Sequence, residues 1–254
     1  MRVIVIVPAY NCERTIQKVI ADLNNHFVDK ILIIDDGSSD RTVELARQMK
    51  TAGISHVRNY GLGCALRTGF KEALRQKFDL ILTFDGDGQH LASDIKKVKK
   101  AFERNPSADL VIGSRLKDRK HWSKFPRHRL WGNLILTWLT NRAIGQRAIT
   151  DSQSGYRAIR REALRKMTLR SRRMSISSEI IIEAAYRKLK IAEVSVIPTY
   201  GEEISNYRLL YDTASIVRLV LSRFFVKNKI VKKGPFHRWK QAPDAPYDRR
   251  GVEP

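Results

Sequence analysis

The sequence contains little cysteine and no signal-like N-terminal segment. Only two of the 254 residues are cysteine, Cys12 and Cys64, which excludes a disulfide framework and matches no zinc-type spacing. Such low cysteine use is typical of a reducing compartment. The opening segment MRVIVIVPAY has too short an apolar run for a secretory signal, and no small-residue cleavage site follows it. We therefore expect a cytoplasmic protein without a signal peptide.

Long uncharged apolar segments are also missing. A bilayer-spanning helix needs about 20 such residues. The longest candidate, Leu130–Asn141, is too short, and the 209–226 stretch is interrupted by Asp212, Arg218 and Arg223. We expect no transmembrane helix.

Negative charge is scarce in three segments. Residues 115–147, 157–173 and 222–254 together hold 26 of the 48 basic residues but only 5 of the 26 acidic ones, so the net charge of +22 lies almost entirely in them. Localised positive charge predicts a polyanionic partner such as lipid headgroups, phosphates or nucleic acid, although plain solubility charge is an alternative. No basic cluster is interleaved with stacking aromatics, so we expect no nucleic-acid partner.

Unbroken apolar runs alternate with helical patterns in the first half. The runs are Val3–Val7, Ile31–Ile34, Leu80–Phe84 and Leu110–Ile112, with a weaker strand near Ser55–Arg58. The helical segments between them are Thr15–Asn25, Asp40–Lys50, Cys64–Gln76 and Ser93–Arg104. Runs of this kind suit strands that are covered on both faces, which predicts an α/β fold with a mainly parallel twisted sheet flanked by helices.

The second half is less regular. We expect a mobile basic loop at 115–128, helices at 129–144 and 177–189, strands at 154–159 and 191–198, an amphipathic helix at 207–226 and a basic, disordered tail at 227–254.

Polar clusters follow the predicted strands, where ligands bind in open α/β sheets. The strongest is Asp85-Gly86-Asp87, whose two carboxylates suit Mg²⁺ or Mn²⁺, although an ordinary Asp-Gly turn is the alternative. Tyr10 offers a ring face for a base, and Asp36 offers acceptors for a base or ribose. Asp40 is better explained as a helix N-cap.

The ordered segments VPAYN, IDDGSSDRT, NYGLGCALRTGF, FDGDGQH, GSR and DSQSGYR resemble those of inverting family 2 glycosyltransferases of the GT-A fold. Within that family they look most like polyprenyl (dolichyl) phosphate mannosyl- and glucosyltransferases. The resemblance covers about residues 3–226. It implies a nucleotide-sugar-binding half at 1–114 and an acceptor-binding half at 115–206 of one domain, followed by the helix 207–226 and the tail.

The resemblance also implies site residues. The donor nucleotide would be held by Pro8, Tyr10, Glu13, Asp36, Asn59, Gly61, Gly69 and Asp85, and the metal by Asp85, Asp87 and Gln89. The family often has Glu directly after the Asn of the first motif, whereas here Cys12 precedes Glu13, so either residue could face the base. Asp87, Asp151 and Arg115 would be catalytic. Glu179 matches a further family position, although a first-turn helical Glu explains it nearly as well.

Arg115, Arg129 and Asn133 resemble the family's clamp for an acceptor phosphate. Arg129 and Asn133 lie one helical turn apart and so face the same side, and Arg binds phosphate bidentately. A solvated basic helix face is the alternative. His90 and His128 are interpreted as structural or as supporting groups.

The implied reaction is hexose transfer from GDP- or UDP-hexose to a polyprenyl phosphate, with inversion. A lipid phosphate is already ionised and needs little help from a base, whereas a hydroxyl acceptor in envelope polysaccharide would need one, for which Asp151 is the candidate. The basic segments predict peripheral attachment to an anionic membrane, directly or through a separate membrane subunit. A dinucleotide-dependent dehydrogenase is excluded because no Gly-x-Gly-x-x-Gly follows the first strand.

Overall fold

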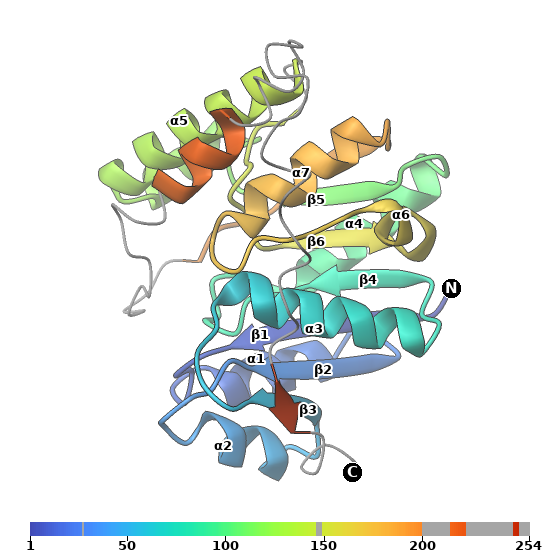
Figure 1. Cartoon of the computed structure of the whole chain (residues 1–254), viewed down its shortest axis with the longest axis vertical. Helices are drawn as coiled ribbons and strands as arrows, with labels where there is room; N and C mark the ends of the chain where they lie inside the picture. Colours follow the sequence, from blue (N-terminus) through green and yellow to red (C-terminus); the bar gives the residue numbers. More distant parts are fainter. Residues whose placement is uncertain (27, 146–148, 200–213, 222–245, 249–254) are drawn as a thin grey trace.

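A computed structural model describes residues 1–26, 28–145, 149–199, 214–221 and 246–248 (Figure 1). The first half contains β1 (Val3–Ala9), α1 (Ile16–Asn24), β2 (Lys30–Asp35), α2 (Thr42–Gln48), β3 (Ala52–His56), α3 (Leu62–Arg75), β4 (Leu80–Thr83), the 3₁₀ helix η1 (Ala92–Asp94), α4 (Ile95–Arg104) and β5 (Leu110–Ser114). The second half contains the 3₁₀ helix η2 (Arg119–Lys124), α5 (Arg127–Ile144), β6 (Arg157–Arg160), α6 (Arg161–Lys166), α7 (Ile176–Tyr186), β7 (Ile191–Ser195), a helix over 214–221 and β8 (Tyr247–Asp248).

The strands form one sheet in the order β7-β5-β6-β4-β1-β2-β3-β8. Strands β1 to β4 are mutually parallel, and β5 is parallel to β7. Strand β6 runs antiparallel between β4 and β5, so β5 points the same way as β4. The predicted α/β class with a mainly parallel, helix-flanked sheet is confirmed.

Both faces of the sheet are covered, which explains the unbroken apolar runs. Alternate residues of β1 point to opposite faces. Val3, Val5 and Val7 pack with α1, α2 and α4, whereas Ile4 and Ile6 pack with α3, α6 and α7. Each of these five side chains is at most 2% exposed.

Helix α5 lies outside these two layers. Its inner face packs on α7 and on the helix 214–221, which runs beside it in Figure 1. Among the described residues, no helix combines the length and apolar character that crossing a bilayer requires.

The segment expected to be a mobile loop, 115–128, is instead structured. Leu116 and Phe125 are buried, η2 lies between them, and the Asp118 carboxylate accepts the backbone N–H of Lys120 at the start of η2. The apolar anchors at both ends of the segment were overlooked because basic residues surround them.

Two other expectations need revision. Strand β6 begins at Arg157 rather than Ser154, because the residues before it bond to other elements. The backbone N–H of Ser152 donates to the Thr137 hydroxyl of α5, and the Ser154 hydroxyl donates to the Gly113 carbonyl of β5. Within the tail expected to be disordered, Tyr247 and Asp248 pair with His56 and Ser55 as the edge strand β8. Of the predicted helix 207–226, residues 214–221 are helical; its remaining residues, and most of the tail, lie outside the described residues.

Gly69 serves the packing of α3 on the sheet. A Cβ at this position would lie 2.5 Å from Cγ2 of Ile6, so only glycine lets the helix approach β1 this closely. Gly69 therefore has a packing role, and its contact with the donor stays a prediction.

We predict that Gly69→Ala destabilises the protein by about 1–3 kcal/mol, the usual cost of overpacking. The matched control is Gly132→Ala on α5, where a Cβ would meet nothing within 4 Å. At that position the better helix propensity of alanine should increase the stability of the protein by about 0.5–1 kcal/mol. Urea unfolding of both variants measures the difference. Equal or greater stability of Gly69→Ala than of the wild type would contradict the packing argument.

Candidate active site

The polar clusters predicted from the sequence meet at one edge of the sheet. Strands β1, β2, β4 and β5 all point the same way, so the residues that follow them lie at their common carboxyl end. Strand β1 extends through Pro8 to Ala9, two residues further than expected, and the Pro8 carbonyl accepts the backbone N–H of Gly86 at 3.3 Å. The first strand end therefore touches the DGD turn directly.

The DGD turn is supported from both sides. The Thr15 hydroxyl donates to the carbonyl of Gly86 at 2.6 Å, and the Thr199 hydroxyl donates to that of Gly88 at 3.0 Å. Within the turn, Asp87 Oδ1 accepts the backbone N–H of Gln89 at 3.0 Å. Gly88 has a φ of +78°, which glycine adopts without strain. These contacts hold the predicted metal ligands Asp85, Asp87 and Gln89 on one short turn.

His90 orients Asp85. Its Nε2 lies 3.2 Å from Asp85 Oδ2, and its ring stacks on Tyr156 at a centroid distance of 5.3 Å. Gly155 packs against the other side of the Asp85 carboxylate, where any Cβ would collide with it. His90 is thus a supporting group, as interpreted from the sequence, but its specific partner was not foreseen.

The surrounding charges keep Asp85 ionised. Burial by itself would raise the pKa of Asp85, but the hydrogen bond from His90 and the positive charges of Arg115 and Arg157 outweigh it and lower that pKa. Arg157 is almost fully buried, and burial lowers its pKa to about 10, which still leaves it charged at neutral pH. Arg157 belongs to the DSQSGYR segment but was not predicted as a site residue, because nothing in its spacing revealed that β6 would bring its charge close enough to act on Asp85.

These residues fit a magnesium or manganese ion. The turn offers ionised carboxylate oxygens, the donors that hard divalent cations prefer, and the Asp85 side chain keeps 28% of its surface exposed. Among the described residues, no group of three or more His, Cys, Asp or Glu side chains is placed to hold a metal ion. Mg²⁺ commonly takes one or two carboxylates and completes its shell with phosphate and water, so the two aspartates of the turn could hold it together with a donor diphosphate.

Asp36 organises the predicted nucleoside corner. Its Oδ1 is 2.8 Å from His56 Nδ1 and accepts the backbone N–H of Tyr60, and its Oδ2 accepts that of Gly61 at 2.6 Å. His56 in turn contacts the Thr68 hydroxyl at 2.9 Å. Asp36 therefore shapes the loop before α3, and the exposed Asn59 lies on that loop. Contact of Asp36, Tyr10 and Asn59 with a nucleoside stays a prediction.

Cys12 and Glu13 lie in different surroundings, and which of them faces the base stays a prediction. The Cys12 sulfur lies 3.6 Å from the carbonyl oxygen of Tyr10 and beside Gly86, and burial raises the pKa of the thiol to about 11. The exposed Glu13 accepts the backbone N–H of Arg41 at the start of α2. Asp40, interpreted as a cap, accepts the N–H of Thr42 in that first turn.

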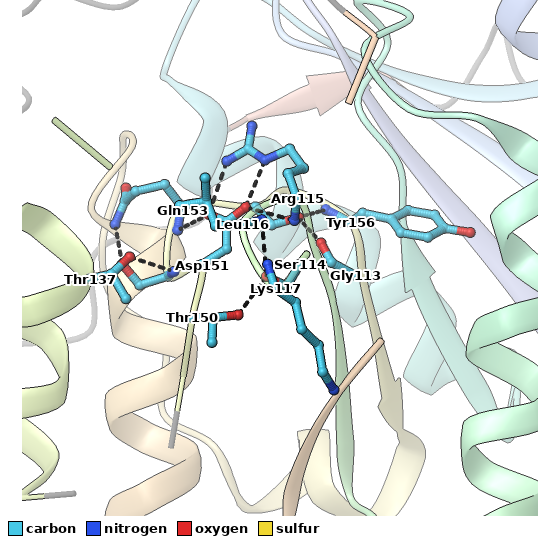
Figure 2. A network of polar contacts seen from close by, with 12 residues as sticks. Gly113, Ser114, Arg115, Leu116, Lys117, Thr137, Thr150, Asp151, Gln153 and Tyr156 are labelled. Atoms are coloured by element: carbon cyan, nitrogen blue, oxygen red, sulfur yellow. Dashed lines mark hydrogen bonds and ion pairs between the residues drawn. The ribbon is translucent and has the colours of Figure 1, made fainter. Parts of the chain in front are cut away.

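A buried ion pair joins the end of β5 to the loop before β6 (Figure 2). Arg115 Nε and Nη2 donate to Asp151 Oδ2 and Oδ1 at 2.7 and 3.0 Å, and the backbone N–H of Arg115 also donates to Oδ2. The Asp151 side chain is fully buried. These contacts favour a positioning role for Asp151 over contact with substrate, in contrast to the catalytic role predicted for it.

Helix α5 places the other predicted acceptor residues. The Thr137 hydroxyl accepts the backbone N–H of Ser152 at 3.0 Å, so this face of α5 is turned toward the 151–154 loop. Arg129 and Asn133 precede Thr137 by eight and four residues and share its face. Both are half-buried, which is more consistent with a role on the inner face than with a fully solvated one.

Glu179 holds the loop that covers Gly61 in the predicted nucleoside corner. Its buried carboxylate accepts the backbone N–H groups of Arg170 and Ser171 at 3.0 and 2.8 Å. The same loop passes directly over Gly61, where a Cβ would lie 2.6 Å from the carbonyl oxygen of Arg172. Gly61 also has a φ of +99°, so the close approach and the backbone both require glycine there.

Residues 4–168 match the glycosyl transferase family 2. The chain belongs to this family. It is 38% identical over 216 residues to the UDP-N-acetylglucosamine–dolichyl-phosphate N-acetylglucosaminyltransferase of Methanococcus voltae, covering 78% of this chain and 85% of that protein. It is also 34% identical to the polyprenol monophosphomannose synthase of Mycolicibacterium smegmatis, covering 66% of this chain and 65% of that protein. The predicted family is confirmed, and the protein is a glycosyltransferase.

Solved structures confirm the GT-A-type fold. Glucosyl-3-phosphoglycerate synthase from Mycobacterium tuberculosis, in complex with Mn²⁺ and UDP-glucose, superposes with a TM-score of 0.67. The match covers 91% of this glycosyltransferase and 80% of that chain at 18% identity, so the likeness concerns the fold alone.

We predict that Asp151→Asn lowers the stability of the glycosyltransferase by about 3–5 kcal/mol at neutral pH, because it leaves the Arg115 guanidinium buried without its counter-charge. Burial would raise the pKa of Asp151, but Arg115 outweighs it and lowers that pKa below its unfolded value. The pair therefore contributes its full stability above about pH 4, the unfolded pKa, and loses it as the pH falls through the lower folded pKa.

The difference in stability between the wild type and Asp151→Asn, measured by thermal unfolding between pH 7 and pH 3, should therefore become smaller as the pH falls. The matched control is Glu44→Gln, which removes the exposed Arg41–Glu44 pair and should change little at any pH. A constant gap between wild type and Asp151→Asn across this range would contradict the assignment.

Proposed function

We propose that this glycosyltransferase transfers a hexose from GDP- or UDP-hexose to a polyprenyl (dolichyl) phosphate at the cytoplasmic face of a membrane, with inversion at the anomeric carbon. The observation that carries the proposal is the DGD turn, where His90 and two buried arginines keep Asp85 ionised and oriented. The acceptor class is suggested by relatives whose names specify dolichyl or polyprenol phosphate.

On the donor side, Asp85, Asp87 and Gln89 would hold Mg²⁺ or Mn²⁺. Such an ion neutralises the diphosphate and makes it a better leaving group. The role of the protein is to keep Asp85 ionised and the turn fixed before the donor arrives, since Thr15 and Thr199 already anchor the turn. The structural relative crystallised with Mn²⁺ and UDP-glucose supports divalent-ion use in this fold.

On the acceptor side, the state of Asp151 favours a phosphate nucleophile. A hydroxyl acceptor needs a base, and Asp151 was the candidate, yet its two oxygens accept hydrogen bonds from Arg115 and from backbone N–H groups. A lipid phosphate is ionised at neutral pH and can attack once it is positioned. Arg129 and Asn133 on α5 would bind it, and Arg115, held by Asp151, would add positive charge near the reacting groups.

The lipid acceptor implies work at a membrane. We propose that the protein attaches peripherally to an anionic membrane surface, directly or through a separate membrane subunit. The cationic segments 115–147 and 157–173 supply the attraction to acidic headgroups.

We predict that Asp87→Ala lowers the rate of sugar transfer by about 10³-fold or more. The reason is that the turn contributes most to catalysis by stabilising the charge of the leaving group. The assay uses a panel of GDP- and UDP-hexoses with Mn²⁺ or Mg²⁺ and a detergent-dispersed polyprenyl phosphate. Donor binding by Asp87→Ala, measured in parallel by titration calorimetry, should no longer depend on the metal.

The matched control is Asp118→Asn, an aspartate that caps η2 outside the DGD turn. It should retain transfer. Turnover by Asp87→Ala at the wild-type rate, or undiminished wild-type turnover in EDTA, would overturn the metal assignment.

We predict that Arg129→Ala raises the KM for the polyprenyl phosphate by about tenfold, the effect of losing one charge-assisted hydrogen bond, and leaves the donor KM nearly unchanged. Steady-state kinetics with the dispersed acceptor separates the two constants. Lys100→Ala on α4 removes an exposed charge elsewhere and serves as the control. Equal changes in both KM values would remove Arg129 from the acceptor clamp.

A further inference from the structure

Helix α5 carries apolar residues on two opposite faces. On the inner face, Leu136 and Ala143 are buried against Ile182 of α7 and against Ile216 and Val220 of the helix 214–221. The inner face is therefore already packed within the protein.

The outer face exposes three large apolar side chains. Trp131, Ile135 and Trp138 are 65%, 56% and 59% exposed, and their spacing of four and three residues aligns them along one side of the helix. Scattered exposed apolar residues are ordinary, but two tryptophans and an isoleucine in one stripe form a continuous apolar surface. Such a stripe is typical of an interaction surface.

The charged residues of α5 and of the segment just before it are all of one sign. Residues 119–144 contain no aspartate or glutamate. Exposed basic residues lie before the stripe, at Lys120, Lys124 and Arg127, and beyond it, at Arg142. An indole has an apolar body and a polar N–H, and for that reason tryptophan is enriched where a membrane meets water.

We propose that the outer face of α5, defined by Trp131, Ile135 and Trp138, docks onto an anionic phospholipid membrane. The three apolar side chains enter the headgroup region, and the basic residues at both ends of the stripe bind acidic headgroups. A convex helix face with an isoleucine between its tryptophans suits lipid better than nucleic acid, which binds in grooves that offer successive stacking rings. The proposal rests on the proposed function, since it locates the membrane that holds the lipid acceptor.

The position of this surface suits the acceptor site. Residues two apart in a helix lie about 200° apart around its axis, so Arg129 and Asn133 point away from Trp131. They share the face of Thr137, whose hydroxyl contacts the 151–154 loop. Docking through the outer face would therefore bring the lipid surface within about one helix diameter, ~10 Å, of the predicted acceptor residues.

The test is co-sedimentation of the full chain with vesicles of phosphatidylcholine alone, or with about a third phosphatidylglycerol to supply negative charge. The wild type should bind the anionic vesicles preferentially. The double substitution Trp131→Gln with Trp138→Gln should lower the partition coefficient by about tenfold or more, because two interfacial indoles are lost. The matched control is Tyr186→Gln, an aromatic residue of α7 that is 66% exposed.

A second pair of variants tests the charge. Lys120→Gln with Lys124→Gln removes two positive charges next to the stripe, and Lys96→Gln with Lys100→Gln removes two exposed charges from α4. The first pair should weaken binding to anionic vesicles by about thirtyfold, because each lost charge contributes to the attraction, and the second pair much less. Equal losses would show that net charge, rather than this surface, drives binding and would overturn the proposal.

Further outcomes would also overturn it. Tryptophan variants that bind like the wild type would remove α5 as the docking surface. A wild type that ignores lipid vesicles and binds only vesicles containing a membrane protein would replace lipid by a protein partner.

Transfer to a detergent-dispersed polyprenyl phosphate, measured in parallel, separates this inference from the proposed function. The tryptophan variants should retain that activity and lose transfer only to vesicle-embedded acceptor. Failure of the wild type with dispersed acceptor would refute the proposed function, while the vesicle experiment would still decide the docking surface.

Discussion

Two buried arginines make it possible to gather carboxylates at one edge of this sheet. Asp151 is fully buried and Asp85 is partly buried, and burial alone would favour the neutral forms of both. Arg115 pairs directly with Asp151, and the positive charges of Arg115 and Arg157 lower the pKa of Asp85. The hydrogen bond from His90 and the charges of Arg115 and Arg157 together outweigh the effect of burial and favour the ionised form of Asp85.

This arrangement depends on the antiparallel strand β6. It is inserted between β4 and β5, and its register places Arg157 opposite both Thr83 and Ile112. The loop that precedes it, residues 151–156, therefore lies between the DGD turn and Arg115. Gly155 touches Asp85, Tyr156 stacks on His90, and Asp151 holds Arg115. One short loop thus connects the predicted donor and acceptor halves.

Helix α5 connects this loop to the predicted acceptor residues. Its apolar inner face is used for packing on α7, while Thr137 connects it to the loop of Asp151. Because Arg129 and Asn133 share the face of Thr137, any attachment of the opposite face would orient the predicted acceptor residues relative to the attached surface. The geometry of a single helix would then couple membrane attachment to acceptor binding.

The sequence by itself determined the fold class, the family and the location of the DGD turn. Apolar runs buried on both faces, such as Val3–Val7, have few structural solutions, and polar clusters after parallel strands must share one edge. The roles of individual side chains were decided only by the tertiary structure. Spacing does not reveal that Asp151 is fully buried against Arg115, that Gly69 faces Ile6, or that the charge of Arg157 acts on Asp85. These facts depend on contacts between residues far apart in the chain, and local periodicity carries no information about such contacts.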